Sequence, residues 1–346
     1  MKVKFAIVGC GHIGKRHAEL VAKHPNAALV ATVDPAYDKF ETSASQCIHF
    51  KSLDDFFKQK IAVDVINICT PNGLHAKQAI QCLNQNCHVV IEKPIALKME
   101  DAHAILAAAN KNGRHVFPVV QNRYSSTVKW LKQLLNSGAL GNIFMIQLNC
   151  FWNRDQHYYS KGNWHGTLAL DGGPLFTQFS HFIDVLNWVF GTMTNINSKF
   201  YNFSHQSNTE FEDSGLITFE INGAAGTISY TTSVFQNNFE SSITVIAENG
   251  TVKIGGQYMN CLEYCQINGT EQPILDENTL VNDYGGYKGS ASNHQQVIDN
   301  VVGVLNGLEM PDVSLEEGIR VVESISQIYE NRNIEKIILE KEKPLV

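Results

Sequence analysis

The turn Gly9-Cys10-Gly11-His12-Ile13-Gly14 constrains the fold more than any other stretch of this sequence. It follows a short run, residues 3 to 8, that is mostly apolar and β-branched, as a buried parallel strand is. Its three glycines permit a sharp turn, a close approach of main-chain N–H groups to a pyrophosphate, and a helix packed tightly on the strand. The N-terminus of that helix would then face the anion. We therefore expect a dinucleotide site that includes Gly9, Gly11, His12, Ile13 and Gly14.

A carboxylate at the end of the next apolar run strengthens this interpretation. Residues 28 to 33 form that run, and Asp34 follows it about twenty residues after Gly14, where an acid accepts hydrogen bonds from the adenosine ribose. Asp34 would repel a 2′-phosphate, and Pro35-Ala36 supply no arginine to hold one, so NAD is favoured over NADP. The alternative is a glycine-rich turn that binds nothing. The order of strand, glycines, helix and acid argues against it.

Strands and helices alternate through the rest of this first part. Residues 63–69, 88–91 and 116–120 are typical of buried strands, and the segments between them are compatible with helices. This pattern predicts a parallel, doubly wound sheet, on which ligands bind beyond the carboxyl ends of the strands. We expect the following residues near those ends to contribute to the cofactor site: Thr70, Asn72, His75, Glu92, Lys93 and Gln121.

The pattern changes at about residue 142 to strand-like runs at 143–150, 215–221, 227–232, 243–247 and 251–254. Asn222-Gly223 and Asn249-Gly250 are candidate hairpin turns. One helix is expected at 175–190 and a late one at 315–329, with Ser314 and Glu317 as a capping box. The sequence thus predicts an α/β protein with an N-terminal Rossmann domain (1–122) and a C-terminal α+β domain (123–346) on a mostly antiparallel open sheet. An apolar outer face of that sheet would favour a homo-oligomer, a dimer or tetramer.

Composition limits the partners of this chain. Its 346 residues are 44% hydrophobic, as in a globular protein. The net charge of −7 argues against general affinity for nucleic acid or acidic membranes. No apolar run has the length of a membrane span and no signal peptide precedes the first strand, so a cytoplasmic location is expected. The eight cysteines include no paired CxxC and are expected to be reduced. Cys261 and Cys265 would share one face of a strand, but two ligands do not make a zinc site, and no metal is expected.

Lys93 is the first candidate for chemistry. Because it precedes Pro94, its backbone is biased towards an extended conformation at a strand end, and its side chain can point into the cleft. A cationic nicotinamide nearby would disfavour the ammonium and make a neutral, proton-accepting amine accessible. The alternative is a solvated surface lysine.

His181 is the second candidate. On the expected helix at 175–190, it shares a polar face with Thr177, Asp184 and Trp188. Histidine acts as a general acid or base near neutral pH, and Asp184, about one turn further on, would orient it. The alternative is a structural histidine bonded to a neighbour.

The third group follows the first strand of the second domain. The segment Trp152-Asn153-Arg154-Asp155-Gln156-His157-Tyr158-Tyr159 mixes polar and aromatic residues, and Lys161, Trp164 and His165 continue it. Arg154 or Lys161 can pair with a carboxylate or phosphate, while the aromatic faces can stack on a sugar or base. An ordinary connecting loop is an equal alternative. The expected substrate-binding residues are Arg154, Tyr159, Lys161, Trp164, His165, Asp171, Thr177 and His181.

Three motifs together resemble the Gfo/Idh/MocA oxidoreductase family over nearly the whole chain: the glycines at 9, 11 and 14, Glu92-Lys93-Pro94, and the segment from Asp171-Gly172-Gly173 through His181 to Asp184. The resemblance implies that Lys93 and His181 serve catalysis and that the antiparallel domain forms the oligomer contact. Many members carry an aspartate four residues before the histidine, where this chain has Thr177. The 152–159 segment and Trp164-His165-Gly166-Thr167 look most like the branch that oxidises C3 of UDP-N-acetylglucosaminuronate.

The sequence therefore predicts an NAD-dependent dehydrogenase acting on a secondary alcohol of a sugar or nucleotide sugar. In this hypothesis Lys93, aided by His181, takes the hydroxyl proton as hydride passes to the nicotinamide. Reduction of a cyclic ketone or imine by the same fold is one alternative. An NAD-binding sensor without turnover is another.

Overall fold

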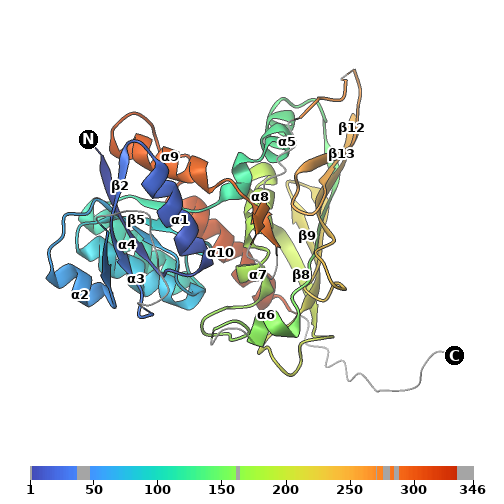
Figure 1. Cartoon of the computed structure of the whole chain (residues 1–346). Helices are drawn as coiled ribbons and strands as arrows, with labels where there is room; N and C mark the ends of the chain where they lie inside the picture. The colour runs from blue at the N-terminus through green and yellow to red at the C-terminus, as the bar shows by residue number, and fades with distance from the viewer. Residues whose placement is uncertain are drawn as a thin grey trace.

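The computed structural model describes residues 2–36, 47–160, 164–269, 271–275, 281–283 and 288–332. Figure 1 shows two sheets set apart from each other, with several helices between them. The smaller sheet belongs to the first part of the chain and the larger one to the second. In the part of the chain that the structure describes, no helix has the length and apolarity needed to cross a membrane.

A six-stranded, all-parallel sheet forms the centre of the first domain, as the alternating pattern predicted. The strand order is β3-β2-β1-β4-β5-β6. The chain therefore adds strands on one side of β1 first and then on the other, and such a switch point leaves a crevice at the carboxyl ends of β1 and β4. Its strands are β1 (Val3–Val8), β2 (Ala27–Val33), β3 (Ile48–Phe50), β4 (Val65–Ile68), β5 (His88–Ile91) and β6 (Val116–Pro118). Its helices are α1 (His12–Lys23), α2 (Leu53–Lys58), η2 (Asn72–Leu74), α3 (His75–Asn84), α4 (Met99–Asn112) and η3 (Gln121–Tyr124).

The second domain is built on a seven-stranded sheet in the order β13-β12-β11-β7-β10-β9-β8. All neighbouring strands are antiparallel except β7 and β10. The strands are β7 (Ile143–Phe151), β8 (Thr194–Tyr201), β9 (Ser214–Ile221), β10 (Ala224–Thr231), β11 (Glu240–Ala247), β12 (Gly250–Gly255) and β13 (Cys261–Ile267). A separate hairpin pairs β14 (Val281–Asp283) with β15 (Lys288–Ala291). The helices are α5 (Ser126–Asn136), α6 (Gln156–Ser160), α7 (Pro174–Thr177), α8 (Ser180–Phe190), α9 (His294–Leu305) and α10 (Leu315–Glu330).

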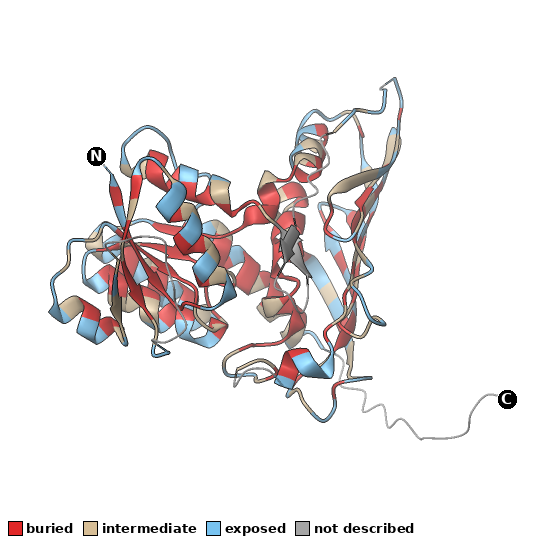
Figure 2. Ribbon diagram, in the orientation of Figure 1, coloured by how far each residue is buried: buried red, intermediate tan, exposed pale blue. Residues whose placement is uncertain are grey.

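Helix α8 is buried on nearly all sides because it lies between the large sheet and the first domain. Figure 1 places it in the middle layer, and Figure 2 shows that buried residues dominate this layer. Leu175, Phe179, Phe182 and Ile183 belong to the core that joins the two domains. The chain segment that carries His181 is thus fixed by packing from both sides.

The two C-terminal helices return to the first domain. Helix α9 packs against α1, and its apolar residues share a cluster with Phe5 and Ile7 of β1. Helix α10 packs against α8 and α4 and begins with the predicted capping box of Ser314 and Glu317. The first domain is therefore covered in part by helices from the end of the chain, a packing that the local sequence pattern did not indicate. The helices α5, α6 and α9 and the strand β8 were also not predicted.

Two local predictions about the large sheet need correction. The hairpin between β11 and β12 has Glu248-Asn249 as its two-residue loop, one residue earlier than predicted, because Ala247 pairs with Gly250. A register shift in the β12–β13 pair, between Lys253 and Ile254, turns Cys261 and Cys265 to opposite faces. The prediction that these two thiols share a face was therefore wrong. The hairpin turn at Asn222-Gly223 is confirmed, with positive φ at both residues.

Candidate active site

A cavity of about 810 Å³ lies at the carboxyl edge of the parallel sheet and extends to the second domain. Most of the residues predicted from the sequence line it: Gly9, Gly11, His12, Ile13, Asp34, Thr70, Asn72, His75, Glu92, Lys93, Gln121, Arg154, Trp164, His165, Thr177 and His181. Gly14, Tyr159 and Asp171 do not line it, and Lys161 falls outside the described residues. The fold thus brings the cofactor candidates and most of the substrate candidates to one cavity.

The glycine turn fits a dinucleotide phosphate. A Cβ on Gly9, whose φ is +87°, would lie 2.7 Å from the backbone of Cys69, and one on Gly14 would lie 1.8 Å from the oxygen of Gly9. Gly11 has open space where its Cβ would be and lines the cavity. Helix α1 begins at His12, directly after the glycine turn, and its N-terminal end is favourable for an anion.

Asp34 lies at the cavity directly after β2. Its Oδ2 accepts a hydrogen bond from the Cys10 N–H at 2.7 Å, and its Oδ1 accepts one from the Ala36 N–H at 2.8 Å. The carboxylate is therefore held beside the glycine turn, where it can accept hydrogen bonds from a ribose diol. The open space at Gly11 leaves room for a dinucleotide, and the Asp34 carboxylate would repel a 2′-phosphate on its ribose. The geometry therefore suits NAD better than NADP.

Lys93 follows β5 and its amine reaches across to the second domain. The amine donates a hydrogen bond to the main-chain oxygen of Thr177. Burial lowers the pKa of Lys93 to about 8, against the opposing effect of the Glu92 carboxylate, while the positive charge of Arg154 lowers it further. An amine with such a pKa is neutral in roughly a tenth of molecules at pH 7, far more than an ordinary lysine, and the neutral form can accept a proton.

The predicted single helix at 175–190 is broken in the structure. Helix α7 ends at Thr177 and α8 begins at Ser180, and the Phe179 N–H bonds back to the Pro174 oxygen. No proline or glycine marks this break in the sequence. Tertiary contacts occupy the groups around it instead: Lys93 binds the oxygen of Thr177, and the Gln178 amide donates to the Tyr158 hydroxyl at 3.0 Å. The break thus presents a main-chain oxygen to the site.

His181 lies in the first turn of α8 and is 5% exposed. Burial and the charge of Lys93 hold its pKa well below the usual value, so the imidazole is neutral. Its Nδ1 has no hydrogen-bond partner among the described residues. The expectation that Asp184 orients His181 is wrong, because both Asp184 oxygens accept hydrogen bonds from Arg123, at 2.6 and 2.8 Å.

Asp171 and Tyr159 lie behind the cavity wall. Asp171 has no exposed surface, and Tyr159 is 5% exposed with its ring against those of His205 and Phe211. This placement differs from the expectation that both contact the substrate. They instead support residues that do line the cavity.

Arg154 is the cation at the substrate end of the cavity. Its guanidinium lies 4.9 Å from the ring centroid of Trp152 and 5.2 Å from that of Tyr158, and Nη1 donates to the Asn153 oxygen at 2.6 Å. The ring of His165 lies against that of Trp164, with centroids 3.7 Å apart and the ring planes inclined by 32°. A fixed cation next to aromatic faces can bind an anionic sugar or nucleotide.

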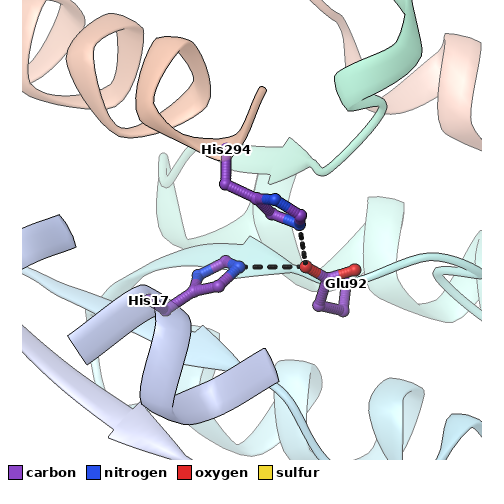
Figure 3. Close-up of side chains that lie close together, drawn as sticks. All are labelled: His17, Glu92 and His294. Atoms are coloured by element: carbon purple, nitrogen blue, oxygen red, sulfur yellow. Dashed lines mark hydrogen bonds and ion pairs between the residues drawn. The ribbon is translucent and has the colours of Figure 1, made fainter. Parts of the chain in front are cut away.

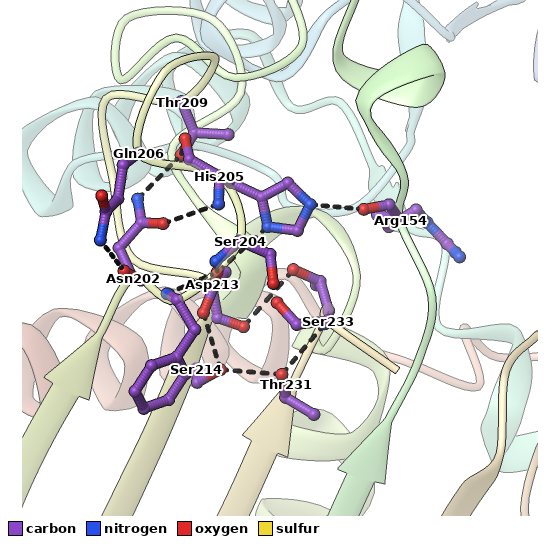
Figure 4. A network of polar contacts seen from close by, with 12 residues as sticks. Arg154, Asn202, Ser204, His205, Gln206, Thr209, Asp213, Ser214, Thr231 and Ser233 are labelled. Atoms are coloured by element: carbon purple, nitrogen blue, oxygen red, sulfur yellow. Dashed lines mark hydrogen bonds and ion pairs between the residues drawn. The ribbon is translucent and has the colours of Figure 1, made fainter. Parts of the chain in front are cut away.

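A buried network holds the backbone of Arg154 from behind (Figure 4). His205 Nε2 lies 2.7 Å from the Arg154 main-chain oxygen, and its Nδ1 lies 3.2 Å from Asp213 Oδ2. Burial raises the pKa of Asp213, but hydrogen bonds from His205, the Ser204 and Phe203 N–H groups and the Ser214 hydroxyl outweigh it and bring the pKa to about 2. The position of Arg154 therefore depends on a loop that the sequence analysis did not consider.

Glu92 is braced by two histidines, as Figure 3 shows. His17 Nε2 lies 2.9 Å and His294 Nε2 lies 3.4 Å from the same carboxylate oxygen. Asn67 donates to His17 Nδ1 at 2.9 Å, which leaves the proton of a neutral ring on Nε2 for Glu92. These contacts join β5, α1 and α9 at the cofactor side of the cavity, which Glu92 and His294 line.

Sequence reasoning missed several lining residues, among them Ser52, Gln178 and His294. Ser52 is the N-cap of α2, where its side chain accepts a hydrogen bond from the Asp55 N–H. Gln178 belongs to the irregular turn between α7 and α8, and His294 begins α9, more than 200 residues after Glu92. No local signal connects these positions with the cofactor motif.

Comparison with known proteins agrees with this geometry. Residues 3–119 match the model of an oxidoreductase family with an NAD-binding Rossmann fold, and residues 128–253 match the GFO/IDH/MocA C-terminal domain. The WlbA dehydrogenase of Bordetella pertussis, solved with NADH and UDP-GlcNAcA, is 31% identical, with a TM-score of 0.84 over 96% of each chain.

Two curated relatives from Escherichia coli align over about half of each chain. D-glucoside 3-dehydrogenase of Escherichia coli is 27% identical over 55% of this chain and 54% of its own length. The E. coli 2,7-anhydro-N-acetylneuraminate hydratase is 27% identical over 55% and 50%, respectively. The chain thus spans about half the length of these relatives. The two matched domains, and the likeness to WlbA along almost the entire chain, show that this protein belongs to the Gfo/Idh/MocA oxidoreductase family and has its NAD-binding Rossmann domain.

Proposed function

We propose that this protein is an NAD-dependent dehydrogenase that oxidises a secondary alcohol of a sugar or nucleotide sugar. The observation that carries the proposal is the amine of Lys93, whose pKa burial lowers to about 8, in the same cavity as the glycine turn and Asp34. A proton-accepting group next to a dinucleotide site is what hydride abstraction from an alcohol requires.

The cofactor end of the cavity is assigned to the residues of the first domain. The turn at Gly9 and Gly11 and the first turn of α1 would hold the pyrophosphate, and Asp34 would hold the adenosine ribose. Further lining residues on this side include Thr70, Asn72, His75, Glu92 and Gln121. NAD, when bound, accepts the hydride. A cavity edge at the β1–β4 reversal supports this placement.

Proton transfer is assigned to Lys93 and His181. The neutral Lys93 amine takes the proton of the substrate hydroxyl, after exchanging its hydrogen bond with the Thr177 oxygen for one with that hydroxyl. His181, neutral because of burial and the Lys93 charge, lines the same cavity and would bond the same hydroxyl or its neighbour. Neither residue needs Asp184, which is fully engaged by Arg123.

The substrate class is proposed from Arg154 and the WlbA likeness. WlbA is described with UDP-GlcNAcA, which carries a carboxylate on its sugar. Arg154, whose guanidinium lies near the rings of Trp152 and Tyr158 and lines the same cavity as Asp34, suits such a carboxylate. The proposed reaction is therefore oxidation at C3 of UDP-N-acetylglucosaminuronate or a closely related nucleotide uronate.

A spectrophotometric screen tests this proposal. NADH formation would be followed with UDP-GlcNAcA, UDP-glucuronate, UDP-GlcNAc, inositols and glucosides, at pH 7 and pH 9. We expect turnover with a uronate and much less with UDP-GlcNAc, which lacks the carboxylate. NAD binding without turnover on any of these, measured by calorimetry, would support a sensor instead. NADH consumption with cyclic ketones or imines alone would support a reductase.

We also infer a homo-oligomer in the cytoplasm. The outer face of the large sheet exposes Met145, Leu216, Ile246 and Tyr264 on four strands, an apolar surface that a second copy would cover. All eight cysteines are free thiols, which suits a reducing compartment. Light scattering should give a dimer or tetramer. Met145→Lys with Ile246→Lys should dissociate it, whereas Leu308→Lys, at an exposed residue outside the sheet, should not.

A further inference from the structure

Asp171 is a carboxylate with no exposed surface. Its Oδ2 accepts a hydrogen bond from the Gly166 N–H at 2.9 Å, and Oδ1 accepts one from the Thr177 hydroxyl. His165 Nδ1 lies 3.7 Å away, and within the described ranges no lysine or arginine forms an ion pair with Asp171. Burying an anion without a full cationic partner is costly, so the carboxylate requires a reason beyond packing.

Thr177 connects this carboxylate to the Lys93 amine. The Thr177 hydroxyl donates to Asp171 and accepts from the Asn72 amide at 2.7 Å, while the Thr177 main-chain oxygen accepts from Lys93. The Asn72 amide also donates to the main-chain oxygen of Asp171 at 2.8 Å. Thr177 ends α7, where the helix breaks, so its side-chain bonds fix a residue that the helix alone would not hold. The direction of its carbonyl, and with it the place of the amine, depends on Asp171.

Among the charged groups that shift the pKa of Lys93, Asp171 is the acid from the second domain. Glu92 precedes Lys93 and is braced by two histidines, and Arg154 follows β7. The charge of Lys93 also acts on His181 of α8 and on His75 of α3. Asp171 is the acidic group that the second domain contributes among the main charges acting on Lys93. It favours the charged form of the amine, against burial and Arg154.

We propose that Asp171 is a positioning residue for the Lys93 amine and acts through Thr177, whose hydroxyl it binds and whose main-chain oxygen holds the amine. The inference rests on the proposed function in that Lys93 is the proton acceptor there. Asp171 holds the amine towards the cavity between turnovers and opposes its premature loss of the proton. It does so without touching substrate or cofactor.

The test uses the full-length protein and two readouts. The first needs no substrate: the rate at which an amine reagent modifies Lys93, measured against pH by peptide mass spectrometry. Asp171→Asn should increase the neutral fraction of the amine at pH 7 by roughly threefold to fivefold, as a downward shift of about half a unit to one unit from a pKa of about 8 gives. The second readout is the pH profile of kcat/KM, measured with the substrate found in the screen. Its acidic limb should move to lower pH by as many units as the pKa of the Lys93 amine falls.

Thr177 variants separate positioning from loss of structure. Thr177→Val, which removes the hydroxyl at nearly constant volume, should change the Lys93 modification profile and lower kcat at least tenfold, and Thr177→Ser should restore both. Glu212→Gln is the matched control, because Glu212 is an acid of the same domain that binds Tyr230 and Tyr329 and is not among the main charges on Lys93. It should leave the Lys93 profile unchanged.

The outcomes are distinguishable. Circular dichroism shows whether Asp171→Asn is folded. If it is folded and its Lys93 modification profile is unchanged, the inference is overturned. If it does not fold, an unchanged Lys93 profile in Thr177→Val overturns the inference. An equal change in Glu212→Gln also overturns it, because the effect would then be a general response to loosening of the domain. A changed profile in a protein that oxidises none of the screened alcohols supports the inference while contradicting the proposed function.

Discussion

The Lys93 amine, at the end of β5, donates a hydrogen bond to the main-chain oxygen of Thr177, at the break between α7 and α8. This bond joins the Rossmann domain to the second domain inside the cavity. It also gives the partly buried Lys93 amine a hydrogen-bond partner until a substrate hydroxyl takes the place of the Thr177 main-chain oxygen. The site is therefore completed only when both domains are in place.

Replacing Lys93 by Met should abolish turnover while largely preserving cofactor binding. We expect kcat to fall by about three orders of magnitude or more, because the proton acceptor is lost, and the Kd for NAD to change only a few-fold. Single-turnover absorbance and calorimetry measure the two effects. Lys98→Met, at an exposed lysine five residues later, is the control and should keep activity. Undiminished turnover in Lys93→Met would remove the amine from the mechanism.

The activity should rise with pH through the pKa of Lys93. Because only the neutral amine accepts a proton and its pKa is lowered to about 8, kcat/KM should fall about tenfold per unit below pH 8 and level off above it. Initial rates between pH 6 and 10 at constant ionic strength measure this limb. A profile that is flat from pH 6 to 8 would contradict an essential amine with this pKa.

Replacing Arg154 by Met should act on the carboxylate of the substrate. KM for UDP-GlcNAcA should rise by about ten- to a hundredfold, since a charge-assisted pair contributes roughly 1.5–3 kcal/mol, while the Kd for NAD stays unchanged. The matched comparison is UDP-GlcNAc, which lacks the carboxylate and should lose little in the same variant. Equal losses on both sugars would mean that Arg154 supports the fold of the cavity rather than recognising the acid.

Arg123 should stabilise the junction between the domains. Its guanidinium forms a two-pronged pair with Asp184 and reaches Glu317 at 2.6 Å, so Arg123→Met leaves a buried carboxylate unpaired. The free energy of unfolding, from urea denaturation, should fall by about 3–5 kcal/mol. Arg123→Met with Asp184→Leu should recover most of the loss. Arg320→Met, at an exposed arginine near Glu317, should cost less than about 1 kcal/mol.

Local patterns predicted the parts of the fold that depend on near neighbours. The parallel sheet, the glycine turn with Asp34 and the capping box at Ser314 were all confirmed, because period, turn chemistry and caps are properties of short segments. The family resemblance was confirmed as well. The catalytic roles of Lys93 and His181 stay predictions until turnover is measured.

The sequence by itself determined two domains, the class of cofactor and the strand ends at which the site would form. Only the tertiary structure decided that the helix breaks after Thr177, that Asp184 pairs with Arg123, and that Asp171 lies behind the wall. The physical reason is that each of these depends on which buried polar group finds a partner far away in the chain. Periodicity describes a segment, whereas hydrogen bonds and ion pairs across 60 to 100 residues are settled only when the domains pack.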